Sequence, residues 1–581
     1  MFLINLVLLD SSTPLVPSDQ LCHLFEKSAL LQFNNSLSLD LEYSDIADLK
    51  TASWKNDTDC CSSWDGVLCD SISGHVIGLN LSFNYLQGSL HSNSTLFSLR
   101  HLQSLILDDI NFNGSPIPPH FGGFANLETL SLDNTNFSDL RSNMIQGNLP
   151  NVPLSLQVFF ISNNHLYGEI PSSYCNLSKI YILDLSNNSI QGKIPSCLGN
   201  KSYLSVLDLD MNELSGEIPD DMFENSIGLR SLHLNGNQLE GALPQSLYNC
   251  KNLEVLDVGR NMINDTFPQW LEDLSMLQVL VLNSNRFHGS IGSPKVKSPF
   301  QKLKIMDLSN NGFIGVLPAK YFESLTAMMN EHVVNKVTRL GDTNYQDSVI
   351  VVMKGIERSL EKIINIFTTI DFSRNDFEGE IPTSIGKLKA LKGLNFSQNK
   401  LKGSIPTSLT HLSNLEWLDL SSNDLIGKIP SDLSNLTQLS FLNLSHNKLV
   451  GPIPSGNQFD TFENDSYSGN LGLCGFPLSN SCKKVTQKGD HDSDKHDEDH
   501  VNLFDWKIVT MGYGCGMMIG IYFGYIMLFS TRKGIHFFFL SLAMAFVVPS
   551  PFPISFSVAL TITDTNKVLL LFFFVVAAKE F

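Results

Sequence analysis

The sequence is short of basic residues. It contains 39 lysines and arginines against 58 aspartates and glutamates, which gives a net charge of −19 over 581 residues. A nucleic-acid-binding protein needs a cationic surface to face the phosphates. The charge balance therefore argues against this class of protein.

Catalytic motifs are also missing. The sequence has no GxSxG, no HExxH and no kinase lysine with its HRD and DFG motifs, and no nucleophile stands beside a base. The acidic run from Gly489 to His500 matches no calcium-binding loop and is interpreted as a solvated stalk. We therefore expect no enzymatic activity, no cofactor and no metal site.

The amino terminus lacks a clear secretory signal. The run MFLINLVLLD is short, has no basic residue at its start and includes Asp10. We interpret residues 1–21 as a weak or truncated signal region, or as the result of a wrongly assigned start.

The chain does have a repeat. LSVLDLDMNELSGEIPDDMF from Leu204 and LEWLDLSSNDLIGKIPSDLSN from Leu415 both follow the pattern LxxLxLxxNxLxGxIP, with a period of about 24 residues. This is the leucine-rich-repeat pattern, and we assign repeats to residues 76–318 and 368–450. The first apolar position of the LxL core occurs at Leu79, Leu105, Leu130, Phe159, Leu183, Leu207, Leu232, Leu256, Leu280, Met306, Ile370, Leu394, Leu418 and Leu442.

The letters of the repeat predict the structure of one coil. The LxL core forms a short parallel strand with its leucines inward, and the asparagine amide satisfies backbone groups where the strand turns. GxIP then favours a turn and an extended or 3-10 segment over a helix. The expected fold is a curved solenoid with an irregular convex side, whose ends must be covered.

Two features break the repeat near its start. The asparagine is replaced by Ile110 and Thr135, so these turns must be satisfied in another way. A second turn-like segment, SDLRSNMIQGNLP, begins at Ser138, far short of a full period. Either this coil is distorted or a block of repeats has been deleted here.

Residues 319–367 interrupt the repeat later in the chain. This insertion contains the strand-like run SVIVVMKG from Ser348 to Gly355. An insertion of this size lies on one face of a solenoid, often the binding face. We expect an ordered island.

Six of the ten cysteines gather at the ends of the repeats. Those at the ends define an N-terminal cap, residues 22–75, and a C-terminal cap, residues 451–482, which is typical of a secreted solenoid. The adjacency of Cys60 and Cys61 argues against a zinc site with Cys69. Cys175 and Cys197 lie about one coil apart and are predicted to form a disulfide, whereas no state is assigned to Cys250 or Cys515.

Glycosylation sequons support an extracellular location for the repeats. The candidate sites are Asn34, Asn56, Asn80, Asn93, Asn113, Asn136, Asn176, Asn187, Asn200, Asn264, Asn395, Asn435, Asn443 and Asn464.

A membrane helix is expected after the stalk, which covers residues 483–505. Ile508 to Phe529 carry no charge, so residues 506–531 can span a bilayer. The run GYGCGMMIGIYFG within this segment does not match the GxGxxG pattern of a nucleotide-binding loop. Glycines at every fourth position, Gly512, Gly516, Gly520 and Gly524, predict a groove for a second helix. The acidic stalk and the basic pair Arg532 and Lys533 indicate a single-pass plasma-membrane protein with extracellular repeats.

The tail, residues 532–581, is unusually hydrophobic. It is interpreted as a cytoplasmic segment, a second membrane span interrupted by prolines, or a foreign end from an aberrant transcript.

Ligand contacts are expected on exposed strand positions of the concave face. Their mixed polar character suits a peptide or a folded protein better than a lipid. The candidates on adjacent coils are Arg230, His233, Glu254, Asp257, Arg260, Gln278, Asn283, Lys304 and Asp307.

Four segments together resemble a known family. These segments are WKNDTDCCSSWDGVLCD, the coils with GxIP, the island with YQDSVIVVMKG, and GPIPSGNQFDTFENDSYSGNLGLCGFPLSNSC. They are similar to segments of plant leucine-rich-repeat receptor-like proteins, in particular the Cf-type disease-resistance group. The resemblance covers about Leu21 to Lys533. Members of this group typically have more repeats, a full signal peptide and a short polar tail.

The resemblance implies a function. It implies recognition of an extracellular, pathogen-derived or self ligand in plant defence, and signalling through an adaptor receptor-like kinase and a co-receptor kinase. It also implies the disulfides Cys22–Cys60, Cys61–Cys69 and Cys474–Cys482, and co-receptor contacts at Trp417, Asp419 and His446. The alternatives are a soluble inhibitor resembling polygalacturonase-inhibiting proteins, a developmental receptor of the same architecture, and a degenerate product without function.

Overall fold

The computed structural model describes residues 22–39, 49–135, 149–329, 340, 345–364 and 366–482. The chain divides into two compact units, Met1–Val485 and Thr486–Phe581, and all of the described residues belong to the first. Several expectations therefore fall on residues outside the described ranges. They concern the signal region, Asn136, the junction near Ser138, the stalk, Cys515, the membrane helix with its glycines, and the tail. Within the described ranges, no helix has the length and hydrophobicity needed to cross a bilayer.

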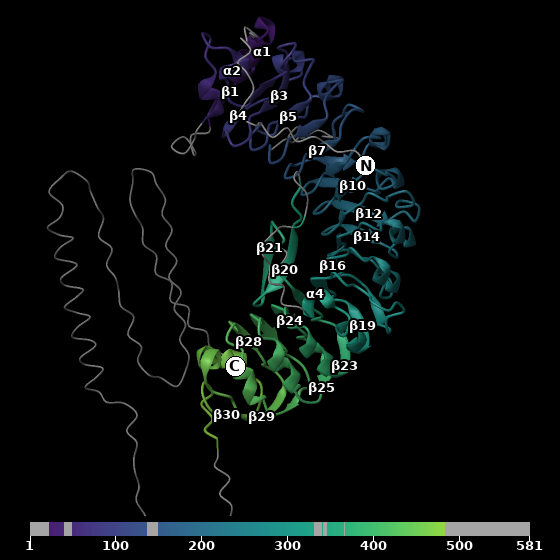
Figure 1. Cartoon of the computed structure of the whole chain (residues 1–581), viewed down its shortest axis with the longest axis vertical. Coiled ribbons are helices and arrows are strands. Elements are labelled where there is room, and N and C mark those ends of the chain that lie inside the picture. The colour runs from purple at the N-terminus through teal and green to yellow at the C-terminus, as the bar shows by residue number, and fades with distance from the viewer. Residues whose placement is uncertain are drawn as a thin grey trace, which may run out of the picture. The chain divides into compact units, whose positions relative to one another are not determined.

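The described residues form the predicted leucine-rich-repeat solenoid. In Figure 1 its coils follow one another along an arc, with the strands of the main sheet on the inner side. This sheet has fifteen strands. They are β2 (Val67–Cys69), β3 (Val76–Asn80), β5 (Ser104–Ile106), β6 (Thr129–Ser131), β7 (Val158–Phe160), β9 (Ile182–Asp184), β11 (Val206–Asp208), β13 (Ser231–His233), β15 (Val255–Asp257), β16 (Val279–Val281), β18 (Ile305–Asp307), β22 (Thr369–Asp371), β24 (Gly393–Asn395), β26 (Trp417–Asp419) and β28 (Phe441–Asn443).

The leucines of the LxL core set the register of this sheet. Neighbouring strands from β3 to β28 are parallel, and the predicted core positions pair in one row, for example Leu207 with Leu232 and Leu256. Their side chains are fully buried. Each coil therefore buries its apolar face against the next coil, as expected for a solenoid.

The asparagine of the repeat joins one coil to the next. The Nδ2 of Asn212 donates to Leu185 O at 3.0 Å in the preceding coil and to Leu209 O at 3.2 Å in its own. Its Oδ1 accepts from the backbone nitrogen of Ile190 at 3.0 Å. The same pattern recurs at Asn188, Asn237 and Asn261, so the predicted role of this residue is confirmed.

The convex side carries short strands and 3-10 helices, as the GxIP segments predict. Proline caps many of the 3-10 helices, because its φ suits the extended residue before the first turn. The strands are β8 (Tyr167–Glu169), β10 (Ser189–Gly192), β12 (Glu213–Glu217), β14 (Gln238–Glu240), β17 (His288–Ser290), β19 (Gly312–Val316), β23 (Asp376–Glu380), β25 (Lys400–Lys402), β27 (Ile426–Gly427), β29 (Lys448–Pro452) and β30 (Gly472–Cys474). The 3-10 helices are η1 (Lys50–Ser53), η2 (Thr95–Ser98), η3 (Pro119–Gly123), η4 (Ser172–Asn176), η5 (Ser196–Leu198), η6 (Gln245–Asn249), η7 (Gln269–Asp273), η8 (Thr383–Lys387), η9 (Thr407–His411), η10 (Ser431–Asn435), η11 (Asn457–Thr461) and η12 (Asn464–Ser466).

The main sheet continues through the irregular region. β6 pairs directly with β7, on either side of the junction near Ser138. The hydroxyl of Thr135, which replaces a repeat asparagine, donates to Leu132 O at 2.8 Å and to the Oδ1 of Asn164 at 2.9 Å. Asn164 in turn donates to Leu132 O, so the next coil satisfies the turn that lacks its own asparagine.

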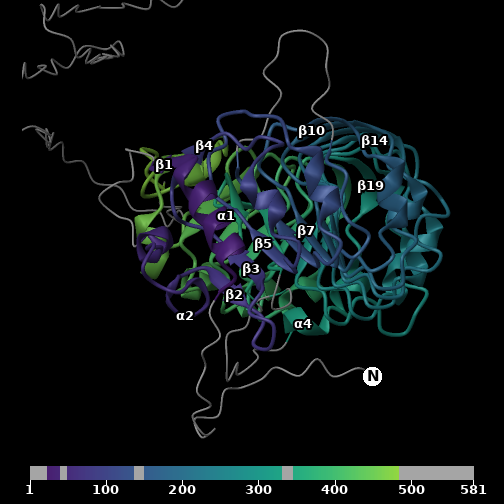
Figure 2. The same ribbon diagram turned by 90° about the horizontal axis from the view of Figure 1, so that it is seen from above.

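The N-terminal cap covers the first coil. It contains α1 (Leu24–Asn35), β1 (Leu37–Leu39), α2 (Cys60–Ser63) and β4 (Leu86–Gly88), and β1 pairs antiparallel with β4. Figure 2 looks onto this end, with α1 at the front. Ala29, Leu30 and Phe33 of α1 are buried in the core, which closes the end of the stack.

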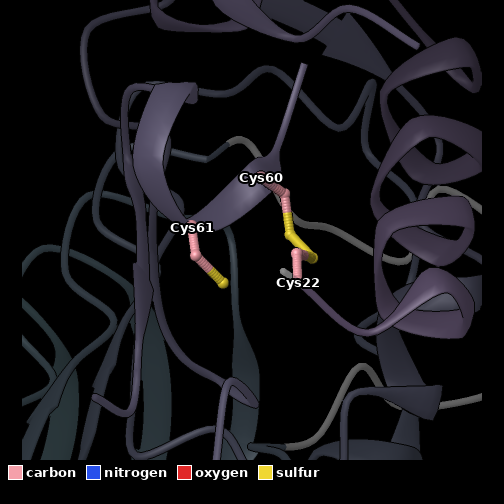
Figure 3. A group of neighbouring side chains, drawn as sticks. All are labelled: Cys22, Cys60 and Cys61. Atoms are coloured by element: carbon pink, nitrogen blue, oxygen red, sulfur yellow. A yellow bond between two sulfur atoms is a disulfide. The ribbon is translucent and has the colours of Figure 1, made fainter. Parts of the chain in front are cut away.

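All four predicted disulfides are present. They are Cys22–Cys60, Cys61–Cys69, Cys175–Cys197 and Cys474–Cys482. Figure 3 shows Cys22 bonded to Cys60, with Cys61 beside them. Among the described cysteines, Cys250 is free of a disulfide and is buried, and burial raises the pKa of its thiol to about 12.

The insertion begins later than the predicted residue 319. α3 (Ala319–Phe322) and α4 (Thr326–Met329) close the coil of β18, with Tyr321, Phe322 and Met328 in the core. The described part of the island is residue 340 and residues 345–364, which include an antiparallel hairpin of β20 (Val349–Met353) and β21 (Ile356–Leu360). We expected one strand-like run, and the structure adds its partner across a turn at Lys354 and Gly355, both with positive φ.

Candidate ligand-binding surface

The concave face carries a row of acidic side chains. The last residue of each main-sheet strand points to this face, and it is aspartate in many coils, including Asp184, Asp208, Asp257, Asp307 and Asp371. All five are buried. Burial raises the pKa of Asp184 to about 8, that of Asp371 to about 7 and that of Asp257 to about 6, with further increases from neighbouring carboxylates.

The island covers the middle of this row. The hydroxyl of Tyr345 donates to the Oδ2 of Asp208 at 2.6 Å, and the Oδ1 of Asp347 lies 3.0 Å from the Nε2 of His233. The ring of Tyr345 is nearly parallel to that of Phe160. The segment before the hairpin is therefore fixed to the concave face by both polar and aromatic contacts.

The hairpin itself packs on apolar strand positions. Val349 and Val351 of β20 belong to one buried cluster with Val255, Val279 and Ile305 of the main sheet. Figure 1 shows β20 and β21 on the inner side of the arc. The island is therefore a lid over the concave face from β11 to β18.

This lid changes the environment of the predicted ligand contacts. We expected nine exposed positions, but His233, Asp257, Asn283 and Asp307 are at most 8% exposed because the island and the neighbouring coils cover them. The Nδ2 of Asn283 donates to Asp307 at 2.7 Å. For these four residues the expected exposure is wrong.

A fifth predicted contact binds the island. The Nη2 of Arg260 lies 2.7 Å from the Oε2 of Glu357 on β21. Arg260 therefore anchors the hairpin at the edge of the concave face.

The remaining four predicted contacts form a polar ladder. Arg230 donates to Glu254 at 3.1 Å, Gln278 donates to Glu254 at 3.0 Å, and Lys304 donates to Gln278 at 2.8 Å. All four precede a strand in consecutive coils and are half-buried. This ladder is the largest group of predicted residues that the structure brings together at an accessible edge.

The predicted co-receptor contacts differ in exposure. Trp417 is only 2% exposed, since Phe367 stacks on it with ring centroids 5.9 Å apart, so its expected accessibility is wrong. Asp419 is half-buried, and burial raises its pKa. His446 is exposed, with its backbone nitrogen donating to Ser468 O at 2.7 Å.

The predicted glycosylation sites are mostly accessible among those that the structure describes. Asn56, Asn93, Asn113, Asn176, Asn187, Asn264, Asn435 and Asn464 are exposed, and Asn34, Asn80, Asn200 and Asn443 are half-buried. Asn395 is 7% exposed and donates to Asp371 at 2.9 Å. The folded chain therefore has no room for a glycan at Asn395, which corrects that expectation.

An open hollow remains beside the island. It has a volume of about 360 Å³ and lies on the concave face of β5, β6 and β7. Asp108 accepts from Ser131 at 2.6 Å, and Asp133 accepts from Ser162 at 2.7 Å. Its lining residues are Ile106, Asp108, Thr129, Ser131, Asp133, Val158 and Phe160.

A larger hollow, of about 850 Å³, lies at η6 and η7 on the convex side. It includes Trp270 and Lys295. It provides a comparison site outside the concave face.

The contacts made by Tyr345 and Asp347 were not predicted from the sequence. The YQD run marks the island, but no local pattern indicates that its side chains bind residues more than a hundred positions away. The only signal was Val281, an apolar residue at a strand position where many other coils have aspartate or asparagine.

The comparisons with known sequences support the repeat assignment. Leucine rich repeat families match residues 155–177, 179–201, 227–287, 368–425 and 406–449. The leucine rich repeat N-terminal domain matches residues 23–70. The chain is 42% identical over 527 residues to receptor like protein 27 of Arabidopsis thaliana, which covers 84% of this chain and 64% of that protein. It is 59% identical over 372 residues to receptor-like protein 52 of the same plant, which covers 63% of this chain and 45% of that protein.

The chain belongs to the plant leucine-rich-repeat receptor-like proteins. This receptor-like protein spans between 28% and 64% of the length of the Arabidopsis relatives that it matches. Its fold is similar to the solved structure of the plant peptide hormone receptor RGFR1 in complex with RGF2. The identity is 27%, the TM-score is 0.53, and the match covers 68% of this chain and 59% of that one.

Proposed function

We propose that this receptor-like protein recognises an extracellular polypeptide, derived from a pathogen, on its concave face. It signals by binding partner receptor-like kinases at the plasma membrane and catalyses no reaction itself. The narrower likeness to the Cf-type disease-resistance group motivates the defence role. The likeness to a solved peptide hormone receptor supports a polypeptide as the ligand.

The observation that carries this proposal is the open hollow next to the island. Phe160 lines the hollow and stacks on Tyr345, so the hollow lies next to the island. Two aspartates, Asp108 and Asp133, lie in the same hollow. An apolar wall beside carboxylates suits a basic or aromatic side chain of a peptide.

The polar ladder offers a second contact. Its side chains place charged groups and one amide along one edge. They belong to Arg230, Glu254, Gln278 and Lys304. Such an edge suits the backbone or polar side chains of an extended peptide, which would run across several coils.

A loss-of-response assay tests the recognition site. The full chain is expressed in plant tissue, which is then treated with an extracellular microbial fraction that elicits a response. The double variant Phe160→Ala and Asp133→Asn should require at least about tenfold more fraction for the same response, since it removes an aromatic and a charged contact. Trp270→Ala, in the convex hollow, is the control. An unchanged response of the double variant at equal surface level contradicts the proposal.

Partner kinases are proposed to bind at two places. An adaptor kinase packs on the glycine groove of the predicted membrane helix, and a co-receptor kinase contacts the last repeats around Asp419 and the exposed His446. Replacing Gly516 and Gly520 with leucine should remove the adaptor kinase from co-precipitates while the chain stays in the membrane fraction. If the kinase is still recovered in full, the groove has no role in the association.

A further inference from the structure

Three potential metal ligands meet under the island. Asp210, His233 and Asp257 come from three consecutive coils, and one ligand atom from each lies within 4.8 Å of the other two. No metal site was expected here, since these residues are 23 to 24 positions apart and match no local ligand motif. Only the stacking of the coils brings them together.

The two ring nitrogens of His233 differ in their contacts with the described residues. Its Nε2 lies 3.0 Å from the Oδ1 of Asp347, whereas its Nδ1 is buried and has no hydrogen-bond partner among the described residues. The Nδ1 is 3.9 Å from the Oδ2 of Asp210, which is too long for a hydrogen bond. A cation about 2.1 Å from each of two ligand atoms holds these atoms about 3 to 4 Å apart.

Two buried amide oxygens beside this cluster also lack donors. In the part of the chain that the structure describes, the Oδ1 of Asn235 and the Oδ1 of Asn283 have no hydrogen-bond partner, while the Nδ2 of Asn235 faces Asp257 at 3.0 Å. The two amides meet over Gly259, where a Cβ would lie 2.3 Å from the Oδ1 of Asn283. Buried acceptors without donors are costly, and a bound cation or a buried water offsets this cost.

We propose that Asp210, His233 and Asp257 bind one divalent first-row transition metal, of the Zn²⁺ type, through the Nδ1 of His233 and one carboxylate oxygen each. Imidazole and carboxylate donors suit such a metal better than Ca²⁺ or Mg²⁺, which prefer oxygen alone. Asn235 lies beside the cluster, where its Nδ2 donates to both carboxylate oxygens of Asp257.

Asp347 of the island acts as a positioning residue. A metal-bound histidine commonly donates its other ring N–H to a carboxylate, which fixes the tautomer and the orientation of the ring. Asp347 accepts in this way from the Nε2 of His233 and leaves the Nδ1 for the metal. The metal therefore couples three coils to the island and strengthens the lid over the concave face.

The second candidate cluster, Glu26 with His75 and His101, differs from this one. The Nδ1 of His75 lies 3.2 Å from the Oε1 of Glu26 and so has a partner, unlike the Nδ1 of His233 among the described residues. This second cluster would also supply two imidazoles instead of one, which a spectroscopic measurement distinguishes.

The test uses the full chain, solubilised in detergent, without an affinity tag and treated with a chelator. Because the acidic run contains three histidines, His491, His496 and His500 are replaced with glutamine in every sample. Zn²⁺ alone is then added in equilibrium dialysis. This background chain should bind one Zn²⁺ tightly, and the double variant Asp210→Asn and Asp257→Asn should bind it at least about 100-fold more weakly. Asp371→Asn, another buried carboxylate of the concave face, is the matched control and should bind Zn²⁺ as the background does.

Two spectroscopic readouts do not depend on whether the double variant folds. Co²⁺ in the background chain should give intense visible absorption bands, and X-ray absorption of the Zn²⁺ form should show one imidazole with oxygen ligands. Asp347→Asn should shift the Co²⁺ bands and weaken Zn²⁺ binding about 10- to 100-fold, whereas Tyr345→Phe should do neither. Absence of the bands, two imidazoles in the spectrum, or equal Zn²⁺ binding by the folded double variant overturns the proposal.

Discussion

At the scale of single residues, the same repeat position is occupied by different residue types in different coils. The last residue of the main-sheet strand is Asp371 in one coil and Asn395 in the next, and the two are joined by a hydrogen bond of 2.9 Å. Both accept from the residue two positions on, Ser373 and Ser397. The repeat therefore tolerates either an acid or its amide at this position, and only the acid makes stability depend on pH.

Asp371→Asn tests this dependence. Burial and Asp307 raise the pKa of Asp371 to about 7 in the folded chain, against about 4 in an unfolded one. The stability contributed by the protonated carboxyl is complete below pH of about 4 and is lost as the pH rises to about 7. Between pH 5 and pH 8 the wild type should therefore lose on the order of 2 kcal/mol relative to Asp371→Asn. Thermal unfolding of both chains across this range measures the difference, and parallel curves contradict the assigned cause.

The residue roles that follow from local spacing were predictable. The inward leucines and the bridging asparagines depend on neighbouring coils at a fixed period, so the sequence determines both. The burial of His233 and Trp417 was not predictable, because it depends on where an insertion folds back. The same holds for the hydrogen bond from Tyr345 to Asp208, whose partners are 137 positions apart.

At the scale of elements, the island is the part that departs from the repeat. Its hairpin buries Val349 and Val351 on the main sheet, while Ile356 on the neighbouring strand is 56% exposed. One face of the hairpin is therefore held by the solenoid and the other faces solvent. The sequence indicated an ordered island and one of its strands, but its position on the concave face needed the three-dimensional structure.

Val351→Asp should release this hairpin. A carboxylate placed against Val279 and Val281 has no partner, and burying it costs several kcal/mol. Limited digestion with trypsin should then cleave after Lys354 at least about tenfold faster than in the wild type, because the hairpin opens more often. Residues 366–482 should stay intact.

Ile356→Asp is the matched control for this experiment. It introduces the same charge into the same hairpin on its exposed face, so cleavage should stay at the wild-type rate. Equal cleavage of the two variants would mean that the island is not held by the contacts of β20.

At the scale of the first unit, the repeats make a long sheet whose ends are closed by disulfide caps. Neighbouring coils contact only one another, so the ends need α1 at one side and the segment up to Cys482 at the other. This architecture leaves the strand face as the continuous functional surface. The island divides it into a covered part from β11 to β18 and an open part at β5 to β7.

The most direct measurement asks where the ligand touches this surface. A photoreactive phenylalanine analogue replaces Phe160 in the concave hollow or Trp270 in the convex hollow, and both full chains are expressed in plant tissue. After treatment with an eliciting extracellular fraction and illumination, the chain labelled at 160 should gain the mass of a polypeptide, and the chain labelled at 270 should not. Cross-linking at 270 alone, or a full response without any adduct at 160, would contradict recognition on the concave face.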